Sequence, residues 1–455
     1  MAKVKRPLMI HLVSLGCAKN LVDSERLFTL ALELLKGQAT IYVEQADLVL
    51  VNTCAFIKDA TKEAVATILE LKSRLKPKAK LVVLGCLPAR YPTLNCSLLP
   101  EADLFVPVGR YEDFPVKILS LYQKPHGALP DAKAPRPLEA WGPTNAKFNF
   151  EELPRELIGT PPHRSYLKIS EGCNHRCSFC TIPKIRGPLK CLSSSSLFKE
   201  AQKLVEEGAL ELTLVAQDLI SWKEGAKGIA ALATKLSKID GLKWIRLMYC
   251  HPDSIDRELI LALKDIPKVL PYLDIPFQHA APNILAKMGR KKTSPLAKVE
   301  MIRKIWPQVA LRATLMVGFP GETQEDMDQL ISFIHNAQLE NLGVFKYSRE
   351  EGTKAALLPD MVPNKLKTKR RGALMKLQKG ISLAKNKQKV GATLEVLVEG
   401  HSFENPILIE GRAFFQAPEV DGKIFFNGEQ PKVGTMVTAK VIKASYYDLL
   451  VTLTS

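Results

Sequence analysis

Short apolar runs alternate with amphipathic segments through the first hundred residues, and this alternation predicts strands followed by helices. The apolar runs occupy residues 10–15, 48–51 and 81–84. Apolar residues at helical spacing follow two of them, over 22–35 and 58–75. Buried strands of parallel sheets read as near-continuous apolar runs, because helices cover both faces of such sheets. The pattern therefore predicts an N-terminal α/β domain with a parallel sheet.

The same alternation resumes at about residue 164. Helical segments such as 196–207, 255–264 and 324–336 separate the strand candidates of this region. The strand candidates are 165–170, 211–216, 244–248, 269–275, 310–317 and 343–346. Six successive strand–helix units predict a partial (β/α)6 barrel, a fold in which active residues lie at the carboxyl ends of the strands.

From residue 391 on, short strands separated by turn residues predict a small five-stranded β-barrel. Its strand candidates are 393–398, 407–413, 423–426, 436–444 and 449–453. Residues 122–162 are rich in proline, which disfavours both helices and sheet ladders, so a linker is expected there. The predicted domains are therefore 1–121, 163–390 and 391–455, with the linker between the first two.

The composition is that of a folded protein, and its charge is unevenly distributed along the chain. The 455 residues are 46% hydrophobic, as in a folded globular protein rather than a disordered one. No apolar stretch reaches the roughly 18 residues of a membrane span and no signal peptide is recognisable, so a cytoplasmic protein is expected. The net charge of +17 indicates either a polyanionic partner or a solubilising surface. Residues 364–389 hold ten Lys or Arg and no acid, whereas 391–455 hold eight acids and five bases.

Cys173, Cys177 and Cys180 form a C-x3-C-x2-C motif after the first predicted barrel strand. Three thiolates can bind a four-iron cluster and leave one iron open to another ligand. Zinc is the alternative, because closely spaced cysteines also bind it. Structural zinc usually takes a fourth ligand at regular spacing, and His175 lies between two of the cysteines rather than after them. The spacing therefore favours an iron–sulfur cluster.

Cys17, Cys54 and Cys86 each follow an apolar run of the N-terminal domain. The carboxyl ends of parallel strands lie along one edge of an open sheet, where ligands bind. Gly16 and Gly85 would let the backbone approach a bulky ligand. Any one of the cysteines could be a buried structural residue, but their shared placement predicts that they meet and hold a second cluster. Three other cysteines lack this pattern and are expected to be structural: Cys96, Cys191 and Cys250.

Together the two triplets resemble the radical S-adenosylmethionine methylthiotransferase family over nearly the whole chain. The segment 14–25 is similar to the N-terminal domain of that family, and 170–173, 182–187 and 318–323 are similar to its radical domain. The terminal barrel resembles its TRAM module. The resemblance implies two [4Fe-4S] clusters and S-adenosyl-L-methionine as cofactors. It also implies a 5′-deoxyadenosyl radical that removes hydrogen from an unactivated carbon, sulfur from the auxiliary cluster and a methyl group from a second S-adenosylmethionine.

Four more residues are candidates for contact with S-adenosylmethionine. The resemblance implies that Phe179 lies near the adenine and the cluster. Gln217 ends the second predicted barrel strand and Gln278 follows the fourth, where strand-end polar groups meet ligands. Arg312, in the fifth strand, would pair with the methionyl carboxylate if its side chain points into the barrel. Gln217, Gln278 and Arg312 are equally compatible with roles in maintaining the fold.

Two types within this family differ in substrate: one modifies an aspartate side chain of ribosomal protein S-12, and the other an adenosine in transfer RNA. Motifs at 14–25, 270–276, 345–348 and 417–422 resemble the protein-modifying type. An acidic terminal domain also suits a basic ribosomal protein better than RNA. We therefore expect ribosomal protein S-12 or the small ribosomal subunit as the partner, with a ribosomal RNA contact through 364–389. An electron donor is also required, and the sequence does not identify it.

Two other functions stay open. One is a non-enzymatic ribosome- or RNA-binding iron–sulfur redox factor, and the other is a radical enzyme for a small molecule. The sequence also departs from the family pattern. Ala18 stands where proline is usual, and Cys191-Leu192 stands near the position of a usual Ser-Arg pair. The missing arginine removes one expected polar contact near the cofactor, without affecting cluster binding.

Overall fold

The computed structural model describes residues 6–122, 150–290, 294–428 and 430–454, which form two compact units. Unit 1 comprises Met1–Gly159 and Lys184–Gly187, and unit 2 comprises Thr160–Pro183 and Pro188–Ser455. Most of the predicted linker lies outside the described residues. Within the described ranges, no helix is both long and apolar enough to cross a membrane.

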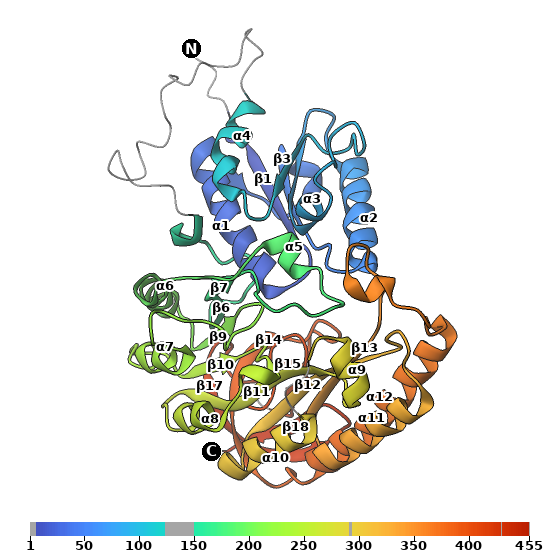
Figure 1. Ribbon diagram of the computed structural model, residues 1–455. Helices are drawn as coiled ribbons and strands as arrows, with labels where there is room; N and C mark the ends of the chain where they lie inside the picture. The colour runs from blue at the N-terminus through green and yellow to red at the C-terminus, as the bar shows by residue number, and fades with distance from the viewer. Residues whose placement is uncertain (1–5, 123–149, 291–293, 429, 455) are drawn as a thin grey trace, which may run out of the picture. The chain divides into compact units, whose positions relative to one another are not determined.

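Unit 1 is built on a five-stranded parallel sheet with the order β2-β1-β3-β4-β5. This confirms the predicted α/β domain (Figure 1). Its strands are β1 (Met9–Ser14), β2 (Gln38–Ala39), β3 (Leu48–Thr53), β4 (Lys80–Gly85) and β5 (Leu104–Pro107). Its helices are α1 (Ala18–Leu35), α2 (Lys58–Arg74), α3 (Cys86–Arg90) and α4 (Phe114–Ser120), with 3-10 turns η1 (Val43–Gln45), η2 (Tyr111–Asp113) and η4 (Phe150–Glu152).

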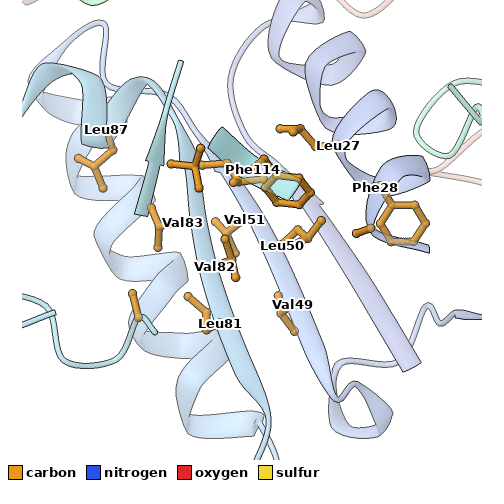
Figure 2. Packing of buried hydrophobic residues seen from close by; sticks show 14 of the residues in the cluster. Leu27, Phe28, Val49, Leu50, Val51, Leu81, Val82, Val83, Leu87 and Phe114 are labelled. Carbon is orange, nitrogen blue, oxygen red and sulfur yellow. The ribbon is translucent and has the colours of Figure 1, made fainter. Parts of the chain in front are cut away.

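The core of unit 1 surrounds the central strands of this sheet. The direction of strand addition reverses after β2, so right-handed crossovers place α1 and α2 on opposite faces. All six residues of β3 are consequently buried. Figure 2 shows Leu50 and Val51 of β3 beside Val82 of β4, with Leu27 of α1 and Phe114 of α4 packed nearby.

Unit 2 contains a six-stranded sheet with the order β13-β12-β11-β10-β9-β6, in which every paired neighbour is parallel. Each strand lies next to its predecessor in the chain, as the predicted partial (β/α)6 barrel requires. The strands are β6 (Arg164–Lys168), β9 (Glu211–Val215), β10 (Trp244–Leu247), β11 (Val269–Gln278), β12 (Ala310–Val317) and β13 (Asn341–Lys346).

Helices alternate with these strands, and a short hairpin lies between β6 and β9 in the chain. The hairpin pairs β7 (Ser170–Glu171) with β8 (Lys190–Cys191). Helix α5 (Ile182–Arg186) lies mostly in the Lys184–Gly187 piece of unit 1. The helices of unit 2 are α6 (Ser194–Glu206), α7 (Ile229–Leu236), α8 (Arg257–Lys264), α9 (Pro282–Lys287), α10 (Pro295–Ile305), α11 (Gln324–Ala337) and α12 (Asn364–Lys387), with 3-10 turns η5 (Pro252–Ser254) and η6 (Lys354–Leu357). The predicted basic segment 364–389 is therefore helix α12.

The last five strands close into a barrel in the order β14-β15-β16-β18-β17, which confirms the predicted small β-barrel. They are β14 (Thr393–His401), β15 (Ile409–Arg412), β16 (Ile424–Phe426), β17 (Met436–Ala444) and β18 (Leu449–Leu453).

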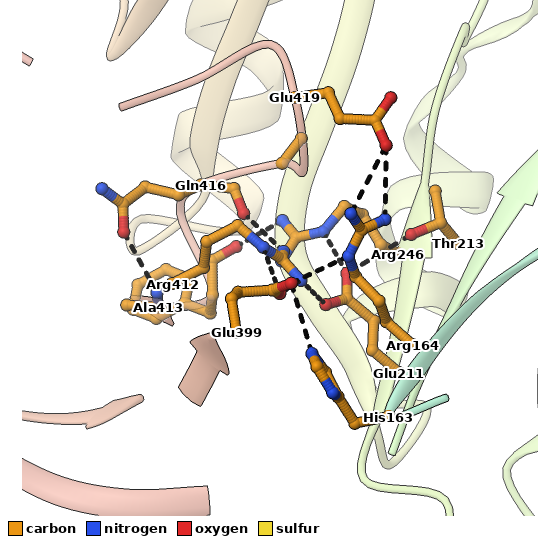
Figure 3. A network of polar contacts seen from close by, with 12 residues as sticks. His163, Arg164, Glu211, Thr213, Arg246, Glu399, Arg412, Ala413, Gln416 and Glu419 are labelled. Atoms are coloured by element: carbon orange, nitrogen blue, oxygen red, sulfur yellow. Dashed lines mark hydrogen bonds and ion pairs between the residues drawn. The ribbon is translucent and has the colours of Figure 1, made fainter. Parts of the chain in front are cut away.

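Buried charges join this terminal barrel to the amino ends of the six-stranded sheet, within unit 2 (Figure 3). Glu211, the first residue of β9, accepts hydrogen bonds from Arg246 Nε and from Arg412 Nη2, each at 2.6 Å. Glu399 accepts one from Arg164 Nε at 2.9 Å. Burial raises the pKa of Glu211, but the charges of the two arginines outweigh it and the pKa is lowered. Because unpaired buried charges are costly, this network fixes the terminal barrel on the sheet.

Candidate metal centres

The strand register of unit 1 brings Cys17, Cys54 and Cys86 to one edge of the sheet. Thr53 of β3 pairs with Gly85 of β4, so the next residues, Cys54 and Cys86, leave the sheet side by side. Ser14 of β1 pairs with Asn52, two residues before Cys54, and Cys17 follows after a short turn. Like charges on these sulfurs would raise one another's pKa, as expected of neighbouring thiols. The structure thus brings together the three cysteines that the strand pattern predicted.

The two glycines of this edge lie where neighbouring strand ends approach closely. Gly16 and Gly85 both have a φ of +93°, a backbone conformation that residues with a side chain rarely adopt. A Cβ at Gly16 would lie 2.6 Å from the Cβ of Cys54, and one at Gly85 would lie 2.1 Å from Asn52 Oδ1. These glycines therefore allow close packing of neighbouring strand ends, and the groups that they accommodate belong to the protein itself.

Asn20 contacts all three strand ends that carry the cysteines. Its side chain is fully buried, and Nδ2 donates to Leu15 O and to Thr53 O, each at 3.0 Å. Those carbonyls lie just before Cys17 and Cys54 in the chain. Its Oδ1 lies 3.9 Å from Cys86 Sγ. The sequence motif around Cys17 contained Asn20, but only the fold shows what the side chain does.

Arg186 reaches the same place from the Lys184–Gly187 piece of unit 1. Its guanidinium donates to Asn20 Oδ1, and Nη2 lies 3.6 Å from Cys86 Sγ. Burial raises the pKa of the Cys17 thiol, but the charges of Lys19 and Arg186, with two backbone hydrogen bonds, outweigh it and the pKa is lowered. Burial dominates at Cys86 and raises its pKa to about 11. Cys17 also precedes the first turn of α1, where the helix dipole favours a thiolate.

The second triplet lies on one loop that follows β6 and β7. Cys180 N donates to Cys177 O at 3.1 Å, which curls the loop around its thiols. Ser178 N donates to Met288 O at 3.0 Å, and Ser178 O accepts from Ala355 N at 2.8 Å. Burial raises the pKa of Cys173, and that of Cys180 to about 12, where the negative charges of the other two thiols add to the effect. The structure therefore gathers this triplet at the carboxyl end of β6, as predicted.

An acid and two histidines support this loop. Asp218 Oδ2 lies 2.6 Å from His175 Nε2, and Asp218 Oδ1 accepts from His251 N at 3.2 Å. The His175 ring stacks on His251 at a centroid distance of 3.8 Å. Asp218 therefore fixes the orientation of the His175 ring within the cysteine loop. Asp218 follows the end of β9, beside the predicted contact Gln217, whereas no pattern in the sequence indicated His251.

Three of the predicted cofactor contacts have the following surroundings: Phe179, Gln217 and Gln278. Phe179 packs against an apolar cluster that includes Met288, and Gln278 ends β11 with a φ of +71°. Gln217 Nε2 donates to Glu171 Oε1 at 2.9 Å. Its buried Oε1 accepts no hydrogen bond from any residue in the described ranges. That oxygen is an available acceptor for a bound cofactor.

Arg312 has a different partner from the one predicted. Its Nη1 donates to Asp421 Oδ1 of the terminal barrel at 2.9 Å, and Nε lies 3.5 Å from Asp274 Oδ1. Tyr272 also donates to Asp421, at 2.7 Å. The terminal barrel has therefore engaged the guanidinium that was expected to bind the methionyl carboxylate.

The segment 318–323 also has a structural explanation. Glu322 Oε2 accepts from Gly318 N at 2.8 Å, and its Oε1 accepts from Arg370 Nη1 of α12 at 2.6 Å. His279 Nε2 lies 3.4 Å from Glu322 Oε2. This buried network joins the ends of β11 and β12 to the basic helix.

Both triplets fit iron–sulfur clusters by their chemistry. All six thiols are free of disulfides, and five of them are only partly buried, so a cluster could reach them. Each triplet supplies three thiolates, which leaves one iron of a four-iron cluster without a cysteine. The remaining cysteines have other surroundings: Cys96 is exposed, Cys250 is buried, and Cys191 Sγ accepts from Lys223 N.

Three family models match the chain. They are Uncharacterized protein family UPF0004 over residues 9–107, the Radical SAM superfamily over 167–334 and the TRAM domain over 390–453. Among curated relatives, "Ribosomal protein uS12 methylthiotransferase RimO" of Geobacter sulfurreducens is 40% identical over 449 residues, covering 97% of each chain. The protein of the same name from Clostridioides difficile is 39% identical over 453 residues, covering 97% of this chain and 98% of its own.

Solved structures share the fold at much lower identity. The radical S-adenosylmethionine methyltransferase TsrM from Kitasatospora setae, solved with cobalamin and a [4Fe-4S] cluster, aligns with a TM-score of 0.54. It is 14% identical, and the alignment covers 77% of this chain and 74% of TsrM. The likeness shows a common fold alone.

Proposed function

This chain belongs to the radical S-adenosylmethionine methylthiotransferase family that acts on ribosomal protein uS12, and we propose that it methylthiolates the β-carbon of an aspartate side chain in that protein. The family assignment makes it an enzyme with a [4Fe-4S] cluster and S-adenosylmethionine as cofactors. The observation that carries the finer proposal is the pair of cysteine triplets, each at the carboxyl end of parallel strands.

Cys173, Cys177 and Cys180 would hold the radical cluster. When bound, that cluster and S-adenosylmethionine would supply the radical chemistry that removal of a hydrogen atom from the target carbon requires. Gln217 would orient the cofactor through its available Oε1. Phe179 and its apolar neighbours would limit the entry of water beside the cluster. Asp218 would act indirectly, because it holds His175 of the cysteine loop.

Cys17, Cys54 and Cys86 would hold a second [4Fe-4S] cluster, which supplies the sulfur. The support is their common sheet edge and the positively charged groups beside them, since cations stabilise thiolates. A second S-adenosylmethionine would supply the methyl group.

Helix α12 would contact ribosomal RNA near the target protein. Of its basic side chains, Arg370 is buried against Glu322, so it contributes to the fold instead. The exposed ones that could face phosphates are Lys365, Lys369, Arg371, Lys376, Lys379 and Lys387. Six exposed positive charges on one helix support an electrostatic contact with RNA. The features described here do not identify a surface to which the electron donor would bind.

Mass spectrometry of reaction products tests the proposed function. The anaerobically reconstituted enzyme would be incubated with S-adenosylmethionine, a reductant, sulfide, and unmodified ribosomes and transfer RNA in parallel. We expect a methylthio mass increase on one aspartate of uS12 and none on transfer RNA. An increase on a transfer RNA adenosine alone would overturn the substrate. Cleavage of S-adenosylmethionine with neither product would overturn the proposal and direct attention to the Cys191-Leu192 departure.

A further inference from the structure

Arg186 is a cation buried beside the Cys17–Cys54–Cys86 centre. Only 1% of its side chain is exposed. An arginine keeps its charge when buried, so its site must provide compensating groups. The residue lies six positions after Cys180, yet its piece of chain, Lys184–Gly187, folds with unit 1.

The contacts of Arg186 lead to the sulfur atoms. Nη2 lies 3.6 Å from Cys86 Sγ and donates to Asn20 Oδ1. Nη1 lies 3.5 Å from Asp23 Oδ2, which is longer than the 2.7–2.9 Å typical of charge-assisted hydrogen bonds. Arg186 thus contacts the acid Asp23, the amide of Asn20 and the sulfur of Cys86.

Three thiolates would bring concentrated negative charge to this buried edge. We propose that Arg186 is a positioning residue of the Cys17–Cys54–Cys86 centre, donating an N–H···S hydrogen bond to Cys86 and stabilising the reduced state of a cluster bound there. The inference rests on the proposed second cluster. Reduction adds one negative charge, and a fixed positive charge in a poorly solvated site lowers the free energy of that state. Hydrogen bonds to sulfur and net charge are known determinants of cluster potentials.

The test isolates the second cluster in the full-length chain. Cys173, Cys177 and Cys180 would be replaced together by Ala, so that only the centre of unit 1 can take up iron. Arg186→Gln removes the charge, Arg186→Lys keeps it, and Lys184→Gln removes an exposed charge from the same piece of chain. Iron and sulfide content would be measured first, and the midpoint potential would then be measured by a redox titration monitored by electron paramagnetic resonance.

We expect Arg186→Gln to disfavour the reduced state about tenfold, a shift of about 59 mV to more negative potential for a one-electron couple. Arg186→Lys should shift it less, and Lys184→Gln should leave it unchanged. An unchanged midpoint in Arg186→Gln with full iron content would overturn the role of Arg186. So would a shift of equal size in Lys184→Gln, because a distant exposed charge would then suffice.

Loss of iron in Arg186→Gln is also decisive, provided that circular dichroism shows a folded chain. Iron retained by Arg186→Lys but not by Arg186→Gln would support a charge requirement. Iron lost from both variants would overturn it, since shape alone would then matter. If the triple-alanine chain with Arg186 intact bound no iron, the proposed second cluster itself would fail, and Arg186 with it. The triple-alanine chain therefore distinguishes a failure of the proposed second cluster from a failure of the role proposed for Arg186.

Discussion

The two cysteine centres are assembled in opposite ways. Cys173, Cys177 and Cys180 lie within one loop, and backbone hydrogen bonds from Ser178 hold that loop. Cys17, Cys54 and Cys86 come from three strand ends, and they meet only because the register of the sheet aligns them. The first centre is thus specified locally, whereas the second depends on the fold of a whole domain.

This difference determines which substitutions would disrupt each centre. The loop is supported by Asp218 from the end of the next strand, so changes elsewhere in unit 2 must reach it through a few contacts. The sheet edge depends on Asn20, which hydrogen bonds to the backbone before two of its three cysteines. Variants that affect one centre and spare the other would show that the two centres are independent, and a variant that removes both would show that they are not.

The largest expected effect is the complete loss of one activity when a cysteine of either centre is replaced. Cys173→Ala should abolish cleavage of S-adenosylmethionine and lower the iron content by about half, because one of two four-iron clusters loses a ligand. Cys54→Ala should lower iron similarly but retain the cleavage and lose sulfur insertion. Product analysis by liquid chromatography and mass spectrometry measures both activities. Cys96→Ala, at an exposed thiol, is the control. Thiolation by Cys54→Ala would disprove the division of roles.

The next effect concerns the stability of unit 2. Glu211→Gln should destabilise it by about 3 kcal/mol, because Arg246 and Arg412 are buried and lose a shared counter-charge. The Cys17–Cys54–Cys86 centre should keep its iron. Urea unfolding followed by tryptophan fluorescence, with iron analysis, checks both statements. Glu410→Gln, which breaks a pair whose lysine is 42% exposed, should cost less than about 1 kcal/mol. Equal costs for the two variants would contradict the role of the buried network.

Asn20→Ala should have a smaller effect, confined to unit 1. It leaves two carbonyls without their buried donor, at a cost of about 1–3 kcal/mol. Iron at the unit 1 centre should fall, whereas cleavage of S-adenosylmethionine should persist. Asn174→Ala is the matched control, since Asn174 is exposed and accepts one hydrogen bond in the other loop. If Asn174→Ala lowered iron at the unit 1 centre as much as Asn20→Ala, the two centres would not be independent.

The smallest effect is a difference in thiol reactivity within one centre. The pKa of Cys17 is lowered and that of Cys86 is raised to about 11, so in the metal-free chain Cys17 should hold more thiolate at neutral pH. Iodoacetamide should therefore modify Cys17 faster than Cys86 at pH 7, and raising the pH should narrow the ratio. Peptide mapping by mass spectrometry measures both rates. A ratio that does not change with pH would show that accessibility, rather than pKa, controls the reaction.

Much of the fold could be predicted because it is recorded in local patterns. The strands that carry the cysteines are continuous apolar runs, and strand order along the chain predicted the six-stranded sheet. Cys17, Cys54 and Cys86 were predicted for the same reason, because each follows such a run, whereas the other triplet was predicted from its C-x3-C-x2-C spacing. Arg186 was not predicted as part of the unit 1 centre, because its motif follows the other triplet and only folding brings it to Cys86.

The terminal barrel shows a limit of counting charges in a sequence. Two of its eight acids, Glu399 and Asp421, pair with arginines of the six-stranded sheet. For Arg312 the contact with Asp421 favours the second of the two roles that the sequence left open, which is to maintain the fold. A strand position tells which residue points toward the barrel interior, but it does not tell what covers the amino ends of the strands.

The buried network between Glu211 and Arg412 has a consequence for the order of synthesis. The two residues are 201 positions apart in the chain. At about 5–20 residues per second, Glu211 must wait roughly 10–40 seconds for its second arginine to be translated. The scaffold of the unit 1 centre, in contrast, has all its parts once residue 186 has emerged. Unit 1 can therefore complete its fold on the translating ribosome well before unit 2.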